Sequence, residues 1–213
     1  MKTIALTTAL FFGLALAAVA QHASAGMDEH ASGSMSPHPS HPAGAPVTYA
    51  DLKNTLEQLE RAKQATAKYQ DVHVAEADGY HQLGPDSPGM AIHFVQTLEP
   101  KAFDIEKPPI LVYEKNPAAS GGYSLVGVVY LWNAAAGLDG QPLDPPLPKS
   151  LVSWHRHPNL CLAPGLTNPH GLTESQCRDQ GGRFLAETPW MVHAWIWKDS
   201  PLGVFSDQNS ALR

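Results

Sequence analysis

Five short segments between residues 91 and 197 are rich in β-branched and aromatic side chains, and clusters of Gly, Pro and Asn separate them. The segments are residues 91–97, 110–114, 123–132, 151–160 and 190–197. This composition and spacing predict β-strands. Because a helical region precedes the strands and does not alternate with them, we expect an α+β fold. In it an N-terminal helical segment packs on an antiparallel β-sheet or an open β-barrel.

The helical region is predicted to begin with a helix over residues 49–66. Thr48 can cap its N-terminus, and Asp51 stands three positions later, as in a capping box. Three apolar side chains follow at helical spacing: Leu52, Leu56 and Leu59. The helix then continues, or restarts, and ends near Gly79. One apolar face of this region must pack on another part of the protein.

The N-terminus has the three parts of a secretory signal peptide. Lys2 precedes an apolar run over residues 4–20, and residues 23–25 (Ala-Ser-Ala) form a cleavage site. We expect a signal peptide at residues 1–25 and export to the periplasm or the extracellular space. Cleavage after Ala20 and an uncleaved membrane anchor are the alternatives. No later segment has the ~20 apolar residues of a spanning helix, so we expect no stable membrane insertion after cleavage.

Residues 26–47 consist mostly of His, Pro, Ser, Gly and Ala, with almost no large apolar side chain. Such a segment buries too little surface to offset the entropy lost on ordering. The composition predicts a disordered linker at residues 26–47 and a single α+β domain at residues 48–213. The linker histidines His30, His38 and His41 either bind copper weakly or belong to a simple spacer.

The chain contains two cysteines, Cys161 and Cys177. In an oxidising compartment an even number predicts one disulfide bond, and two free buried thiols are the alternative. With 14 Lys and Arg against 20 Asp and Glu, the formal net charge is −6. An acidic chain without a basic run is a poor candidate for nucleic-acid binding, so we expect no nucleic-acid partner.

Histidines occur in three of the predicted strands. His155 and His157 are two positions apart, so on a strand both side chains point to the same face. His93 and His193 lie in two other predicted strands. If these strands lie close together, the imidazoles supply the three or four ligands that a metal ion needs. The pattern predicts a zinc or copper site at His155, His157, His93 and His193, with Glu114 as an oxygen ligand or a general base.

Three other interpretations of these residues stay open. The histidines can be structural and hydrogen-bonded to the backbone or to a tyrosine, since a His-x-His pair alone is a weak motif. Trp195 and Trp197 can line a pocket, which makes the protein a non-catalytic binding module for a small apolar or amphipathic ligand. A metal-dependent enzyme with an open coordination position is the third, although no residue pattern indicates a substrate or a nucleophile.

Several runs of residues occur in an order that is typical of one family. They are His93-Phe94-Val95, Tyr113-Glu114, residues 125–130 (LVGVVY), Trp154-His155-Arg156-His157, and residues 191–197 and 201–205 near the end. Over residues 79–160 and this tail, the chain is similar to a family of uncharacterised secreted bacterial proteins that resembles plant oil-body-associated proteins. Val129 stands where that pattern often has an acidic residue. The resemblance implies a shared small β-rich domain and names no reaction.

Overall fold

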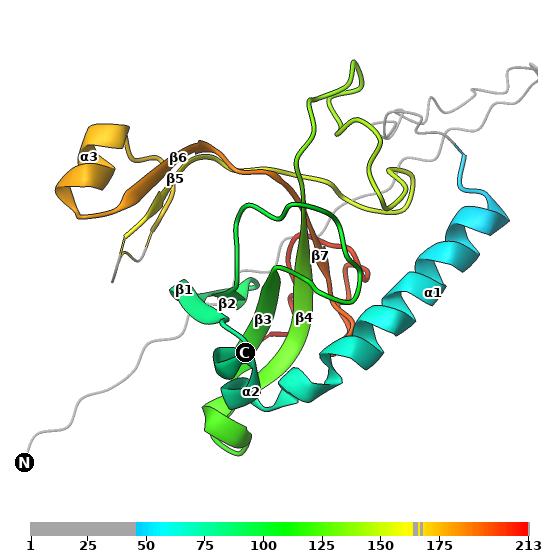
Figure 1. Cartoon of the computed structure of the whole chain (residues 1–213), viewed down its shortest axis with the longest axis horizontal. Helices are drawn as coiled ribbons and strands as arrows, with labels where there is room; N and C mark the ends of the chain where they lie inside the picture. The colour runs from blue at the N-terminus through cyan, green and yellow to red at the C-terminus, as the bar shows by residue number, and fades with distance from the viewer. Residues whose placement is uncertain (1–45, 164–165, 167, 213) are drawn as a thin grey trace, which may run out of the picture. The chain divides into compact units, whose positions relative to one another are not determined.

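The computed structural model of the chain describes residues 46–163, 166 and 168–212. The predicted signal peptide and residues 26–45 of the predicted linker lie outside the described residues. Within the described part, the helical region comes first and the strands follow (Figure 1). No helix there combines the length and the apolar character needed to cross a membrane.

The first helix, α1, spans Tyr49–Thr66, as the sequence predicts. Its capping box is complete, because the Thr48 hydroxyl accepts from the Asp51 amide at 3.0 Å and the Asp51 carboxylate accepts from the Thr48 amide at 3.3 Å. A 3-10 turn, η1 (Ala67–Gln70), and a short helix, α2 (Val72–Ala77), continue the helical region. The predicted restart of the helix is therefore confirmed.

The buried side of α1 differs from the predicted leucine face. Four side chains of α1 are buried: Thr55, Leu59, Ala62 and Thr66. Leu52 and Leu56, which the spacing argument placed with Leu59, are exposed. The largest apolar side chains were thus a poor guide to the packed side.

Five strands form one antiparallel sheet (Figure 1). They are β1 (His81–Ser87), β2 (Ala91–Val95), β3 (Ile110–Lys115), β4 (Tyr123–Trp132) and β7 (Trp190–Ala194). Their order across the sheet is β1-β2-β3-β4-β7. The 3-10 turn η2 (Ser120–Gly122) connects β3 to β4. A helical region followed by an antiparallel sheet is an α+β fold, and the predicted fold class is confirmed.

A second, two-stranded sheet pairs β5 (Pro158–Leu162) with β6 (Arg183–Glu187). The helix α3 (Glu174–Asp179) lies between them in the chain, and Figure 1 draws the three elements in yellow and orange. A disulfide bond joins Cys161 on β5 to Cys177 on α3. The predicted disulfide is therefore confirmed.

The predicted strand at residues 151–160 is wrong over most of its length, because residues 151–157 form no strand. His155 makes only a single bridge to β7, with paired backbone hydrogen bonds to Met191 at 2.7 and 3.0 Å. Trp154 is buried, and its indole N–H donates to the Leu147 carbonyl at 3.2 Å. The segment is therefore rich in residues typical of strands because side chains such as Trp154 are buried, although its backbone forms no β-ladder.

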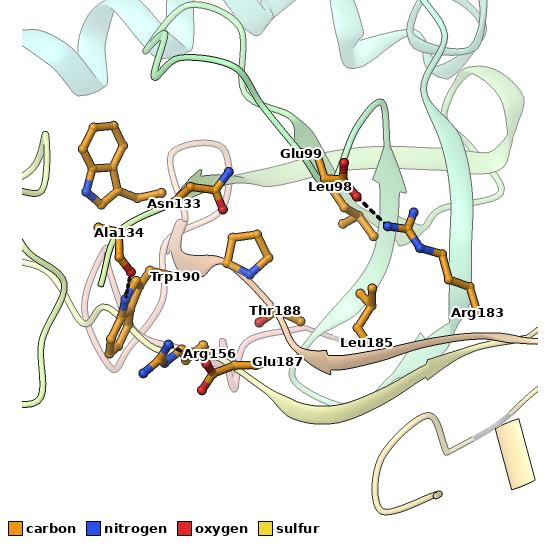
Figure 2. Close-up of a pocket in the computed structure, with 12 residues that line it drawn as sticks. Leu98, Glu99, Asn133, Ala134, Arg156, Arg183, Leu185, Glu187, Thr188 and Trp190 are labelled. Carbon is orange, nitrogen blue, oxygen red and sulfur yellow. Dashed lines mark hydrogen bonds and ion pairs between the residues drawn. The ribbon is translucent and has the colours of Figure 1, made fainter. Parts of the chain in front are cut away.

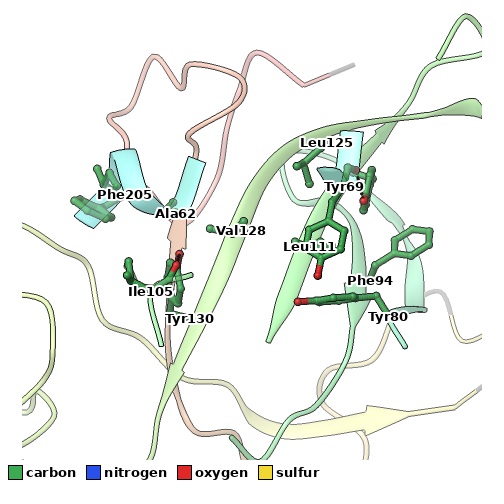
Figure 3. Packing of buried hydrophobic residues seen from close by; sticks show 14 of the residues in the cluster. Ala62, Tyr69, Tyr80, Phe94, Ile105, Leu111, Leu125, Val128, Tyr130 and Phe205 are labelled. Carbon is green, nitrogen blue, oxygen red and sulfur yellow. Dashed lines mark hydrogen bonds between the residues drawn. The ribbon is translucent and has the colours of Figure 1, made fainter. Parts of the chain in front are cut away.

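One face of the large sheet packs on α1 and α2 in an aromatic-rich cluster (Figure 3). Each of three buried tyrosines donates its hydroxyl hydrogen to a backbone carbonyl: Tyr80 to Pro108, Tyr113 to Tyr69 and Tyr130 to Ile105, at 2.6–2.7 Å. These bonds satisfy the polar ends of side chains that otherwise fill the core.

The opposite face of the sheet carries the histidines. Its buried cluster includes Val112 on β3, Val129 on β4 and Trp195 just after β7. His93 pairs across the ladder with Val112, and His193 pairs with Val129. Since directly paired residues point to the same side, both histidines lie on the face away from α1.

Candidate metal centre

His93 and His193 meet across the face of the sheet, and their Nε2 atoms are 3.2 Å apart. Two strands, β3 and β4, separate β2 from β7, so the backbones that carry the rings are about 14 Å apart at a spacing of about 4.8 Å per strand. The rings close this gap over Val112 and Val129. The register of the sheet thus brings together two residues that are 100 positions apart in the chain.

The separation of the two Nε2 atoms fits two chemical states. One is an N–H···N hydrogen bond between neutral tautomers. The other is a shared metal ion, because two nitrogen ligands at about 2.0–2.1 Å from a tetrahedral ion lie roughly 3.3 Å from each other. The pair is therefore already spaced as two ligands of one ion.

His193 is held between two flat side chains. Its ring stacks on His155, with centroids 5.5 Å apart and planes within 4°, and on Trp195, with centroids 5.5 Å apart and planes within 9°. Trp195 fits beside β4 because Gly127 has no side chain there. A Cβ at Gly127 would lie 3.0 Å from Trp195 Cε3 and 2.9 Å from the Ala194 oxygen. The position of the His193 ring therefore depends on this glycine.

His155 presents a free nitrogen beside His193. Its Nδ1 lies 3.1 Å from Asp207 Oδ1 and 3.2 Å from the Ser153 carbonyl, so this nitrogen carries the hydrogen. Its Nε2 is buried and has no hydrogen-bond partner in the described part of the chain. A carboxylate that fixes one imidazole nitrogen while the other is free is the usual outer arrangement of a metal-binding histidine.

Two further histidines extend the group. His157 lies beside His155, with ring centroids 5.3 Å apart, and beside His170, with centroids 5.1 Å apart. The backbone of His157 is fixed by its amide, which donates to the Thr188 hydroxyl at 3.0 Å. His170 and Asp207 were not predicted from the sequence, since both lie in loops where no strand period signals their direction.

Burial lowers the pKa of three of these imidazoles. It lowers the pKa of His93 to about 4, with His157 contributing, and the pKa of His193 falls well below its ordinary value of 6.5 for the same reason. Burial also lowers the pKa of His157 to about 4, with His155 and His170 adding to the effect and Asp207 opposing it. At neutral pH these three rings are therefore uncharged and keep a nitrogen lone pair.

Glu114, the predicted oxygen ligand, lies apart from the histidines. Both of its carboxylate oxygens accept from Lys198 Nζ, at 2.6 and 2.9 Å, and the pair lines a separate cavity. Trp197 lines that cavity too, and its indole donates to the Thr66 hydroxyl. Because β7 ends at Ala194, strand alternation no longer applies, and Trp197 does not share a face with Trp195.

The structure thus brings His93, His155, His157 and His193 together and leaves Glu114 outside. Within the described ranges, no group of three or more His, Cys, Asp or Glu side chains is already arranged to hold a metal ion. The closest approach to a coordination shell is the His93–His193 pair. A third ligand requires a change of side-chain rotamer at His155 or His157.

A second cavity, of about 300 Å³, lies near β6 and has a different character (Figure 2). Its two arginines are already paired: Arg183 with Glu99, and Arg156 with Glu187 at 2.6 Å. Arg156 also stacks over Trp190, with its guanidinium carbon 4.3 Å from the ring centroid. Both arginines already have an acidic partner. This cavity therefore has fewer free groups for binding a ligand than the histidine group has.

Comparisons with known proteins find no relative. No family model, no curated protein and no solved structure matches the chain. The resemblance to oil-body-associated proteins therefore stays a prediction, and the function has to be argued from the geometry of the histidines.

Proposed function

We propose that the protein binds one transition-metal ion, zinc or copper, between His93 and His193, with His155 and His157 supplying the remaining ligands. The observation that carries the proposal is the 3.2 Å separation of the His93 and His193 Nε2 atoms. Nitrogen-only sites suit zinc and copper, and oxygen-preferring ions such as magnesium or calcium have no carboxylate among these four residues.

The state of the four rings supports this proposal. A metal binds neutral imidazole, and burial keeps His93, His157 and His193 neutral down to acidic pH, so protons compete weakly for the site. His155 has its Nε2 free and its Nδ1 fixed by Asp207. The proposal requires side-chain rotation at His155 or His157 to bring further imidazole nitrogens to the existing pair, because a bound ion needs three or four ligands.

The test uses the full chain without an affinity tag, with His22, His30, His38 and His41 replaced by Ala so that the N-terminal histidines bind nothing. Calorimetric titration with zinc chloride, and separately with a buffered copper salt, should give one site per chain. His93→Gln and His193→Gln should each weaken binding by roughly 100-fold or more, since loss of an outer partner alone costs about 10–100-fold.

The matched control is His81→Gln, which changes an exposed histidine at the start of β1. It should leave the affinity unchanged. Circular dichroism establishes that each variant is folded. The proposal is refuted if folded His93→Gln and His193→Gln proteins bind the metal as tightly as the parent does, or if the parent binds none.

We also propose that the protein is exported. The disulfide bond between Cys161 and Cys177 supports this, because disulfides persist in oxidising compartments and are rare in the cytosol. Expression of the full chain in a bacterium, followed by mass spectrometry of the periplasmic and culture fractions, should find a chain that begins at Gly26. Recovery of only the uncleaved chain inside the cytoplasm would contradict export.

A further inference from the structure

Three of the four proposed ligands, His93, His157 and His193, line a cavity of about 350 Å³. Its wall is formed by the histidine face of the large sheet on one side and by β5 on the other. Most of its lining side chains are apolar, and the chief ones are Leu83, Val95, Ile110, Val129, Leu160 and Met191. His170 also lines it.

The described wall of this cavity is mostly apolar and carries no charged side chain. Among its described lining residues there is no Lys, Arg, Asp or Glu. The histidines are therefore its main polar groups, and the rest of the wall offers only apolar contact to an occupant. A molecule that fits must combine an apolar body with one polar group that reaches the imidazoles.

The charge of the site specifies that polar group. A divalent ion held by neutral imidazoles keeps its full charge, and a buried charge without a partner is costly. The carboxylate of Asp207 contacts His155 Nδ1 and is half exposed, so it would compensate the ion only partly. An anionic oxygen donor from the occupant would bind the ion directly and balance its charge.

We propose, on the basis of the proposed metal site, that the protein binds an aliphatic carboxylate of medium length. The carboxylate oxygens bind the metal ion beside His93 and His193, and the hydrocarbon chain fills the apolar cavity. A cavity of about 350 Å³ lies at the lower end of the roughly 300–1,000 Å³ of small-molecule pockets, which suits a chain of medium length. We choose decanoate as the probe.

The experiment titrates decanoate into the zinc-loaded full chain, freed of excess zinc by gel filtration, and into the same protein treated with EDTA. Binding should be at least tenfold tighter to the zinc-loaded protein. Acetate supplies the carboxylate without the chain, and octan-1-ol supplies the chain without the charge. Each should bind at least tenfold more weakly than decanoate.

A cavity-filling variant tests the contribution of the pocket independently of metal binding. Leu160→Trp places a large ring in the cavity from β5 and should reduce decanoate affinity at least tenfold while zinc affinity stays the same. Leu83→Trp does the same from β1 and serves if the first variant does not fold. The matched control is Leu138→Trp, at a fully exposed position away from the cavity, which should change neither affinity.

The outcomes distinguish the two proposals. If zinc binds at the histidines and decanoate does not, the carboxylate inference is overturned and the metal site stands. If decanoate binds equally with and without zinc, or if Leu160→Trp and Leu83→Trp leave its affinity unchanged, the inference is also overturned. If zinc itself fails to bind at His93 and His193, both proposals fall together.

Discussion

At the residue scale, Asp207 decides which nitrogen of His155 is available. Its Oδ1 atom lies 3.1 Å from Nδ1 and accepts the Nδ1–H hydrogen bond, so the lone pair is on the buried Nε2. Without this contact, His155 exchanges between tautomers, and part of the population presents an N–H where a ligand is needed. In the proposed metal site, Asp207 would therefore affect the affinity without being a ligand itself.

Asp207→Asn should weaken zinc binding by about 10–100-fold, because the carboxylate both fixes the tautomer and raises the basicity of the imidazole. The free energy of unfolding in urea should change little, since Asp207 is half exposed. Calorimetry with zinc measures the first quantity. Asp199→Asn, an exposed change in the same C-terminal segment, is the control, and equal zinc affinity for both variants would show that Asp207 has no such role.

At the element scale, the disulfide bond stabilises the second sheet. A two-stranded sheet is marginally stable by itself, and β5 and β6 are joined by a long connection that contains α3. The bond from Cys161 to Cys177 shortens that connection, and Gly182 packs so closely that a Cβ there would lie 2.8 Å from both sulfur atoms. Because β5 lines the cavity beside the histidines, its order affects the site.

Replacing both cysteines, Cys161→Ala with Cys177→Ala, should lower the free energy of unfolding by about 3 kcal/mol, the value expected for a loop of this size. Hydrogen–deuterium exchange should accelerate in β5 and β6 first. Exchange in β3 and β4, at the centre of the large sheet, is the internal control and should change less. Uniform acceleration in all four strands would mean that the bond stabilises the whole domain equally.

The elements of this fold were predictable to different degrees. The capping box located the start of α1, and strong β-propensity located β2, β3, β4 and β7. In contrast, β1 was missed because Gly84 and Pro85 interrupt its pattern, and β6 because its sequence, RFLAE, contains no β-branched residue. For residues 151–157 the pattern misled, since the buried Trp154 mimics a strand residue.

Only four histidines of the candidate site were predictable from the sequence: His93, His155, His157 and His193. The alternation of side chains along a strand predicts on which face of the sheet His93 and His193 lie. Their contact depends on the order of the strands, which no local sequence pattern contains. Glu114 was included because of its residue type, and its partner Lys198 is 84 positions away. Asp207 and His170 lie in loops, where neither the helical nor the strand period predicts the direction of a side chain.

At the scale of the whole molecule, the buried histidines make stability depend on pH. Each has a lower pKa in the folded protein than in the unfolded chain, where the ordinary value of 6.5 applies. Above pH 6.5 both states are uncharged and stability is complete. As the pH falls below 6.5, the unfolded chain takes up protons that the folded protein does not, so the free energy of unfolding decreases toward pH 4.

In the presence of EDTA, the free energy of unfolding should fall by on the order of 2–4 kcal/mol between pH 6.5 and 5, at about 1.4 kcal/mol per pKa unit and with partial exposure of His157 taken into account. Urea titrations at several pH values measure this, in a range where few carboxylates titrate. His93→Gln should flatten the dependence. A parent protein whose stability is constant over this range would contradict the burial of neutral rings.

The two borders of the large sheet have a consequence for behaviour at high concentration. Along β1 the register shifts between Leu83 and Ser87, and Pro85 has no amide hydrogen to donate. Along β7 the backbone of Met191 is already engaged by His155. Neither border offers an incoming chain an uninterrupted row of free donors and acceptors. These two borders are therefore poor templates for edge-to-edge pairing, although the strands of the large sheet are strongly hydrophobic.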